Sequence, residues 1–238
     1  MSGETNVNGR EISASKKPML IVRVLVFIVF VAVIMFVCAG DWLWPMGWLY
    51  LLIFFGVNLV SVVWVPIDEE LMEERTQLKE DVKSWDKWLA TIPSALFPFG
   101  FVVVAALDHR YGWPGSFSTG LVAAAAVVSV AGYGLSLWAA RVNKFYARYV
   151  RIQKERGHVT ITDGPYRIVR HPGYAGLMWY CLASGVALDS VWSLIPAGMI
   201  AVLLIVRTAL EDRTLQAELA GYTQYSQKTR YRLIPGIW

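Results

Sequence analysis

MLIVRVLVFIVFVAVIMFVCA, residues Met19–Ala39, contains a single charged side chain, Arg23. A run of about 18 or more apolar residues predicts a membrane-spanning helix, because a helix satisfies its own backbone hydrogen bonds inside lipid. The run is too long for the apolar region of a signal peptide, and no clear cleavage site of small residues follows it. We therefore interpret it as a retained membrane span.

The composition of the whole chain also indicates an integral membrane protein. Of the 238 residues, 56% are hydrophobic and 17% are charged, whereas soluble domains have about 25% charged residues. The net charge of +4 does not indicate nucleic acid as a partner, because the basic residues stand at the ends of apolar runs, as in membrane proteins. The two cysteines lie in apolar segments without metal-ligand spacing, so we expect no metal site.

Five further apolar segments complete a predicted bundle of about six transmembrane helices. They cover approximately residues 42–65, 88–107, 119–140, 174–188 and 191–210. The segment 119–140 is rich in Ala and Gly, so we expect it to pack closely against its neighbours. The predicted fold class is all-α, a polytopic integral membrane helical bundle with a cytoplasmic connector and a C-terminal cap.

The positions of Lys and Arg predict the orientation of this bundle. Basic residues gather before the first span, after the second, after the fourth and after the last, whereas the opposite side carries only Arg110. Both termini of this multi-pass protein are therefore expected to be cytoplasmic. We divide the chain into a disordered tail (1–17), a four-helix transmembrane region (18–142) and a C-terminal region (143–238). The charged loop 68–86 is expected to be a solvated surface, with an amphipathic helix on the membrane as the alternative.

A polar connector separates the fourth and fifth predicted spans. From Asn143 to Gly176 it reads NKFYARYVRIQKERGHVTITDGPYRIVRHPGYAG, which is longer than a turn between two spans needs. Pro172 disfavours helical geometry at His171, so a helix is expected to begin just after it. Such a helix N-terminus favours an anion, while Tyr166 and Tyr174 offer aromatic faces to a purine or a cation. A surface or capping role is the alternative for the histidine.

A second candidate segment, RTALEDRTL, covers Arg207 to Leu215 at the end of the sixth predicted span. Arg207 and Glu211 are four residues apart, so they share one face of a helix. Ionisable residues at the edge of a span are functional candidates, and an interfacial Arg–Glu pair that ends the helix is the alternative. The stretch that follows contains Tyr222 and Tyr225, and we interpret it as a cap over the site.

These motifs resemble the isoprenylcysteine carboxyl methyltransferase family, including its bacterial and archaeal members and the related phospholipid N-methyltransferases. The resemblance rests on GPYRIVRHPGYAG, two spans, and then RTALEDRTLQAELAGYTQYSQKTRYRLIPGIW, and covers about residues 143–238. It implies S-adenosyl-L-methionine as the cofactor, in a cytoplasm-facing pocket, and the lipid bilayer of a bacterial inner membrane as the surroundings. It also implies an amphipathic or prenylated acceptor. The acceptor atom and the oligomeric state stay open.

The resemblance also implies roles for individual residues. The cofactor-binding positions are Gln153, His158, Val159, Thr160, Ile161, Tyr166, His171, Pro172, Gly173, Tyr174 and Glu211. Reaching the strip that begins at His158 requires a two-residue gap. Arg207 matches an arginine at the substrate side, and it is expected to be catalytic together with Glu211. The family often has paired glutamates where this chain has Glu211 and Asp212, which leaves the role of Asp212 open.

The chemistry of these residues is consistent with the implied cofactor. Glu211 can accept from its ammonium group, and His171 or a helix N-terminus can meet its carboxylate. Methyl transfer needs no covalent enzyme intermediate, so catalysis would consist of positioning and electrostatics. In this interpretation, Arg207 holds an anionic acceptor.

Two other functions stay open on the sequence alone. Membrane sterol and enone reductases, which use NADPH, have a related C-terminal fold and ends that resemble YRLIPGIW, although they usually have more than six spans. A membrane protein that keeps the fold without catalysis is the third possibility.

Overall fold

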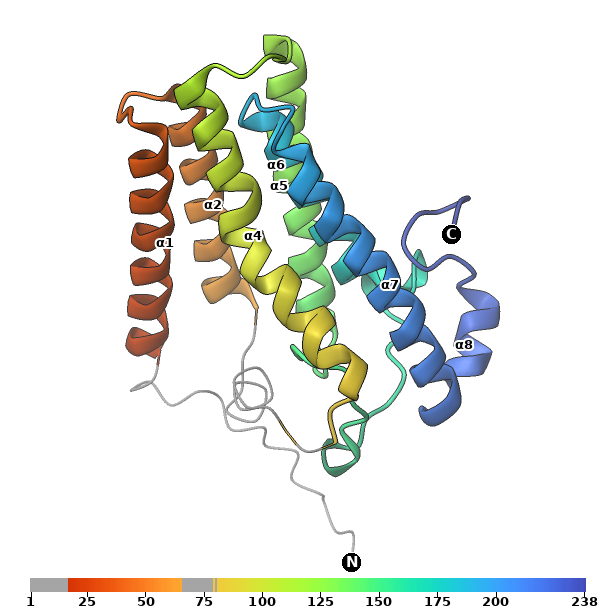
Figure 1. Cartoon of the computed structure of the whole chain (residues 1–238). Helices are drawn as coiled ribbons and strands as arrows, with labels where there is room; N and C mark the ends of the chain where they lie inside the picture. The colour runs from red at the N-terminus through yellow and green to blue at the C-terminus, as the bar shows by residue number, and fades with distance from the viewer. Residues whose placement is uncertain (1–16, 66–78, 80) are drawn as a thin grey trace, which may run out of the picture.

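The computed structural model describes residues 17–65, 79 and 81–238, and every regular element in this part of the chain is helical. Six long helices form a bundle (Figure 1): α1 (Lys17–Ala39), α2 (Pro45–Trp64), α4 (Ser84–Tyr111), α5 (Thr119–Val142), α6 (Pro172–Ala187) and α7 (Leu194–Glu218). The shorter elements are η1 (Lys154–Arg156), η2 (Gly164–Arg167) and α8 (Tyr222–Lys228). The predicted all-α class is confirmed for these residues. Residues 1–16 of the predicted disordered tail and most of the charged loop 68–86 lie outside them, while Lys17, the last residue of that tail, begins α1.

Four of the described helices are long and apolar enough to cross a membrane, namely α1, α2, α5 and α7. Helices also form at the predicted third and fifth spans, as α4 and α6, but these two are not among the four. With 16 residues, α6 is about 24 Å long, which is shorter than the roughly 30 Å of a bilayer core. An integral membrane protein is therefore supported, while the number of six spans stays a prediction.

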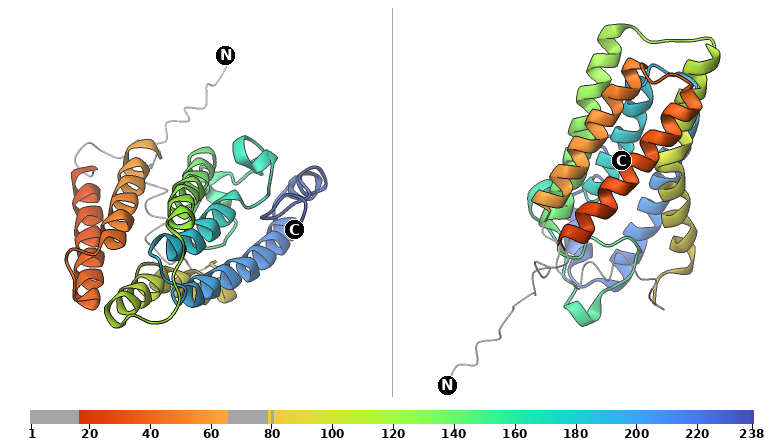
Figure 2. Two further views of the ribbon diagram at one scale, coloured as in Figure 1. Left: turned by 90° about the horizontal axis from the view of Figure 1, so that it is seen from above. Right: turned by 90° about the vertical axis from the view of Figure 1, so that its left-hand side faces the viewer.

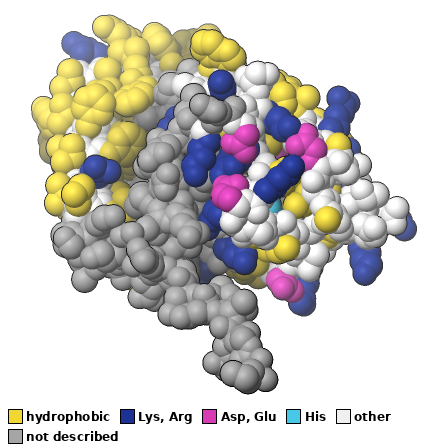
Figure 3. Space-filling model, turned by 90° about the horizontal axis from the view of Figure 1, so that it is seen from below, with side chains coloured by type: hydrophobic (Ala, Val, Ile, Leu, Met, Phe, Trp, Pro, Cys, Tyr) yellow, Lys and Arg dark blue, Asp and Glu magenta, His cyan; other side chains and the backbone are white. Residues whose placement is uncertain are grey.

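Large apolar side chains on these helices point away from the bundle. Val26 is 63% exposed, Val63 is 79% exposed and Val127 is 69% exposed. Such a surface is unfavourable in water but suits the acyl chains of a bilayer. In the view from below, apolar side chains gather on the α1 side, whereas Lys and Arg gather with Asp and Glu on the other half of the face (Figure 3). The charged half of this face is where the site described below lies.

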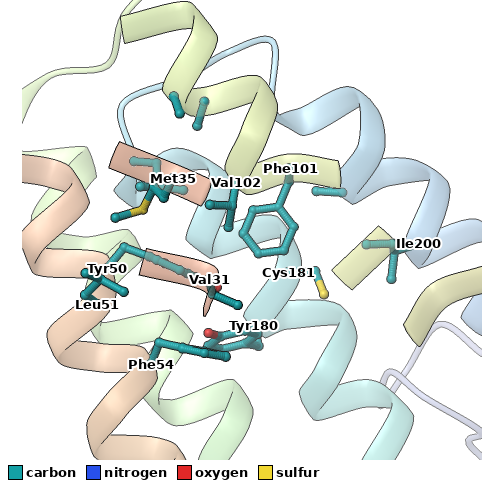
Figure 4. Close-up of a cluster of buried hydrophobic side chains, with 14 of the residues drawn as sticks. Val31, Met35, Tyr50, Leu51, Phe54, Phe101, Val102, Tyr180, Cys181 and Ile200 are labelled. Atoms are coloured by element: carbon teal, nitrogen blue, oxygen red, sulfur yellow. The ribbon is translucent and has the colours of Figure 1, made fainter. Parts of the chain in front are cut away.

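One apolar cluster joins the helices before the connector to the two helices after it (Figure 4). Its labelled members are Val31 and Met35 of α1, Tyr50, Leu51 and Phe54 of α2, Phe101 and Val102 of α4, Tyr180 and Cys181 of α6, and Ile200 of α7. Burial of these side chains fixes α6 and α7 against the N-terminal helices. In the turned views of the ribbon, α7 lies beside α4 (Figure 2).

Helices α5 and α6 pack backbone to backbone at Gly132 and Gly176. A Cβ atom placed on Gly132 would lie 2.8 Å from the carbonyl oxygen of Gly176 and 2.9 Å from the backbone nitrogen of Tyr180. Any larger residue at Gly132 would force the two helices apart. The close packing predicted for the Ala- and Gly-rich segment is therefore confirmed, and it sets the position from which α6 begins.

Helix α7 is longer than predicted at its C-terminal end. The sixth span is expected from the sequence to stop near residue 210, but the helix continues to Glu218. Four of the eight added residues are charged, but several are good helix formers, so the helix continues where the apolar run stops. Eight more residues extend it by about 12 Å. This extension carries Glu211 and Asp212 to the connector, so the RTALEDRTL segment lies inside the helix rather than at its end.

Candidate active site

A large pocket lies between the connector, the first turns of α6, the last turns of α7, and α8. Counted out to its mouth, so that open solvent there is included, its empty volume is about 1140 Å³. Eleven of the twelve residues assigned from the sequence line it: Gln153, His158, Val159, Thr160, Ile161, Tyr166, His171, Gly173, Tyr174, Arg207 and Glu211. The twelfth, Pro172, begins α6 beside them. The structure therefore gathers residues from three separate sequence segments around one cavity.

Gln153 shapes the connector wall of this pocket. Its side chain is buried, its Nε2 donates to the carbonyl of Phe145 at 2.9 Å, and its Oε1 accepts from Arg156 at 2.6 Å. Its backbone N–H donates to Nδ1 of His158 at 3.3 Å. The amide nitrogen and oxygen of Gln153 are therefore both hydrogen-bonded within the connector. These bonds, with the backbone bond to His158, hold the strip that begins at His158 against the pocket.

The side chain of His158 is held in its neutral form. Burial, together with the nearby positive charges of Arg156 and Arg151, lowers its pKa to about 4. Because Nδ1 accepts the hydrogen bond from Gln153, the ring proton belongs on Nε2. His158 thus offers the pocket one N–H donor and no charge.

Acidification should destabilise the protein in part through His158. An unfolded histidine has a pKa of 6.5, and the folded value is about 4. Between these values the unfolded chain binds a proton that the folded chain does not, so the free energy of unfolding falls as the pH is lowered through this window. His158→Gln should show a shallower fall. Thermal unfolding in detergent from pH 7 to pH 4.5 checks this, and equal slopes for the two proteins would contradict a buried neutral ring.

Tyrosines form much of the remaining wall. The hydroxyl of Tyr166 accepts from Asn143 at 3.1 Å, and its carbonyl accepts from the hydroxyl of Tyr225 at 2.7 Å. Burial raises the pKa of the Tyr166, Tyr222 and Tyr225 hydroxyls well above the usual value. These rings therefore stay neutral and present flat apolar faces of the kind on which a purine packs.

Glu211 brings a carboxylate with an open oxygen to the pocket. Its Oε2 accepts from the hydroxyl of Tyr174 at 2.5 Å, and its Oε1 lies 3.9 Å from Nδ1 of His171. Among the described residues, no hydrogen bond to Oε1 is formed. The carboxyl group is therefore oriented by Tyr174 and keeps one oxygen for a cationic ligand.

Arg207 pairs with Asp86 of α4, and no ion pair joins it to Glu211 within the described part of the chain. Its Nε and Nη2 lie 2.7 and 3.0 Å from the two oxygens of Asp86, and Nη2 also donates to the carbonyl of Arg148. The guanidinium lies 5.2 Å from the ring centroid of Tyr174. The predicted shared face of Arg207 and Glu211 is present, since both line the pocket, but the alternative of an Arg–Glu pair is wrong.

Asp86 escapes prediction because the sequence places it in the solvated loop 68–86. That assignment is wrong for this residue, which is fully buried in the first turn of α4. Its Oδ2 also accepts from the backbone N–H of Val150 at 2.6 Å. An acid just before an apolar run is a sequence signal for a helix start. Nothing in the sequence pairs it with Arg207, 121 positions later.

Asp212 is a buried centre that joins the connector, α7 and the C-terminal segment. Its side-chain partners are Arg170 at 3.3 Å, His171 at 3.4 Å, and Gln216, Tyr222 and Arg232 at 2.9 Å each. Two backbone hydrogen bonds run beside them, from Arg170 to the carbonyl of Tyr231 and from His171 to that of Arg232. The segment after α7 therefore folds against the connector as predicted. The role of Asp212, which the sequence leaves open, is to hold the segment after α7 against the connector.

Comparison with known families agrees with this geometry. Residues 123–217 match the model of the isoprenylcysteine carboxyl methyltransferase (ICMT) family. The matched region runs from α5 into the last turn of α7 and includes all twelve assigned residues, whereas Asp86 lies outside it. Among curated proteins, no relative matches the chain. The resemblance is therefore confirmed: over residues 123–217 the chain has the pattern of the isoprenylcysteine carboxyl methyltransferase family, a family of membrane methyltransferases.

Proposed function

We propose that the protein is an S-adenosyl-L-methionine-dependent methyltransferase that acts on a lipid-like or prenylated acceptor at the cytoplasmic face of the membrane. The observation that carries this proposal is the open oxygen of Glu211 in a tyrosine-walled pocket. The pocket is built largely by the region that matches the family. The pocket suits a ligand that combines a cationic group with a flat ring system.

The groups around the pocket suit the three parts of the proposed cofactor. Glu211 would accept from the ammonium group. His171 and the N-terminus of α6, which begins at Pro172, would meet the carboxylate. The adenine ring would pack on the neutral tyrosines, of which Tyr166 comes from η2 and Tyr222 from α8.

The chain's own contribution to the reaction would be positioning. The cofactor supplies a methyl group on a positively charged sulfur. Arg207 on the pocket wall would hold an anionic acceptor in line with that methyl group, which lowers the entropic part of the barrier. A carboxylate acceptor needs no base, whereas an amine must lose a proton.

The surroundings of the pocket suit an acceptor that lives in the bilayer. The connector is polar and carries many basic side chains, while α5 and α7 present apolar surfaces outward. We therefore propose that both termini and the connector are cytoplasmic. The cofactor then reaches the pocket from water, and an amphipathic acceptor remains anchored in lipid.

Methyl transfer tests this function directly. Purified protein in lipid vesicles would be incubated with S-adenosyl-L-methionine that carries a labelled methyl group. The acceptors would be an S-prenylated N-acetylcysteine, phosphatidylethanolamine and a long-chain thiol. We expect label in one acceptor, and much slower transfer by Glu211→Gln when the cofactor concentration is close to the wild-type Kd. No transfer to any of these or to the lipids of the source membrane, with NADPH oxidation in a parallel assay, would contradict the proposal.

A further inference from the structure

Asp86 controls which edge of the Arg207 guanidinium is left for a ligand. Its two oxygens accept hydrogen bonds from Nε and Nη2, and the carbonyl oxygen of Arg148 accepts a hydrogen bond from the second hydrogen of Nη2. Within the described residues, Nη1 has no hydrogen-bond acceptor. Since Arg207 lines the pocket, Nη1 is the part of the group that remains for an anion there.

The position of Asp86 is itself fixed from the connector. Its side chain is fully buried, and the N–H of Val150 holds Oδ2 at 2.6 Å. The carboxylate therefore has little freedom to move away from the arginine when a ligand arrives. Asp86 lies outside the family match, so the N-terminal half of the chain supplies the ion-pair partner of a residue that lines the pocket.

We propose that Asp86 is a positioning residue that restricts Arg207 to a one-point contact with the carboxylate of the acceptor. This inference rests on the proposed function. A free guanidinium binds a carboxylate through two parallel hydrogen bonds, which would engage both oxygens. With Nε and Nη2 occupied, only one oxygen is held. The other is free to attack the methyl carbon.

The negative charge of Asp86 also favours methyl transfer over tight binding of the acceptor. In the transfer step the bond from methyl carbon to sulfur breaks, its electron pair stays on sulfur, and a carbon–oxygen bond forms. No proton moves, and a positive and a negative charge are both lost. A fully positive Arg207 would stabilise the reacting carboxylate more than the transition state, in which that charge is disappearing. Because the negative charge of Asp86 compensates the positive charge of Arg207, it weakens binding of the acceptor carboxylate and increases turnover.

Binding without cofactor separates this role from a structural one. The two probes are an S-prenylated N-acetylcysteine and its carboxamide, which have nearly the same shape, but in the carboxamide an uncharged NH2 group replaces one carboxylate oxygen. Asp86→Asn should raise the affinity for the carboxylate relative to the carboxamide by about tenfold, while turnover of the carboxylate falls by about tenfold or more. Asp86→Glu keeps the charge and should preserve the wild-type ratio. If Asp86→Asn does not fold, Asp86→Ser replaces it, and the same changes in affinity ratio and turnover are expected.

Glu218→Gln is the matched control, because Glu218 pairs with Lys83 at 2.7 Å on the exposed surface, where α7 passes the start of α4. It should change neither ratio nor turnover. An unchanged affinity ratio in Asp86→Asn, or equal weakening of both probes, would overturn the inference. A wild type that shows the predicted ratio but transfers no methyl group would instead contradict the proposed function and leave the binding role of Asp86 standing.

Discussion

Asp212→Ala should destabilise the folded protein by about 3–5 kcal/mol, the range for removing one partner from a buried ionic group. The carboxylate of Asp212 is fully buried and faces the charged groups of Arg170 and Arg232 as well as His171 and Tyr222. Without it, several cationic or polar groups remain buried without their common acceptor. The connector and the C-terminal segment should therefore separate from α7.

Thermal unfolding in detergent and limited proteolysis measure this effect. Asp212→Ala should lower the melting temperature and expose the segment after α7, including α8, to protease. Gln216→Ala removes one partner of Asp212 that lies on the same helix, and should have a much smaller effect. Equal melting temperatures for wild type and Asp212→Ala would show that the ion pairs around Asp212 do not hold the C-terminal segment in place.

Glu211→Gln should weaken binding of S-adenosyl-L-methionine by about 30-fold, which corresponds to about 2 kcal/mol for a hydrogen bond to a charged group. Glutamine has the same shape and can still accept from the hydroxyl of Tyr174. The loss therefore isolates the negative charge at the open oxygen, where the ammonium of the cofactor would be held. Stability should change little, because the side chain is partly exposed and has no cationic partner at hydrogen-bond distance among the described residues.

Two matched variants show whether the loss of affinity is specific to the charge of Glu211. Glu218→Gln removes the same charge seven residues further along α7, where Glu218 faces Lys83 on the surface, and should leave the affinity unchanged. Arg207→Lys should change cofactor affinity less than Glu211→Gln does, since Arg207 is assigned to the acceptor. Equal cofactor affinity for wild type and Glu211→Gln would refute the assignment of Glu211.

The helices are predictable from the sequence where each depends on a local property. Long apolar runs predict α1, α2 and α5, and Pro172 predicts the start of α6. The C-terminal end of α7 is not predictable from apolarity, since this part of the helix is rich in charged and polar residues and contacts the connector through Asp212. Membrane insertion of α4 and α6 also stays a prediction. Their short or mixed sequences do not meet the length and hydropathy expected of a span.

The site is predictable where its residues follow one another in the chain. The connector from Gln153 to Tyr174 and the pair of Arg207 and Glu211 are recognisable as motifs, and their side chains meet at one pocket. Asp86, the partner of Arg207, is not recognisable in this way, because in the sequence it resembles any solvated acid of a charged loop. Asp212 is visible as a departure from paired glutamates, but its five partners come from three separate segments that only the fold brings together.

Calorimetric titration of the detergent-purified wild-type protein with S-adenosyl-L-methionine, and separately with NADPH, tests the central claim most directly. We predict one molecule of S-adenosyl-L-methionine bound per chain, with affinity reduced in Glu211→Gln, and no binding of NADPH. Binding of NADPH alone would contradict the methyltransferase assignment and favour the reductase interpretation.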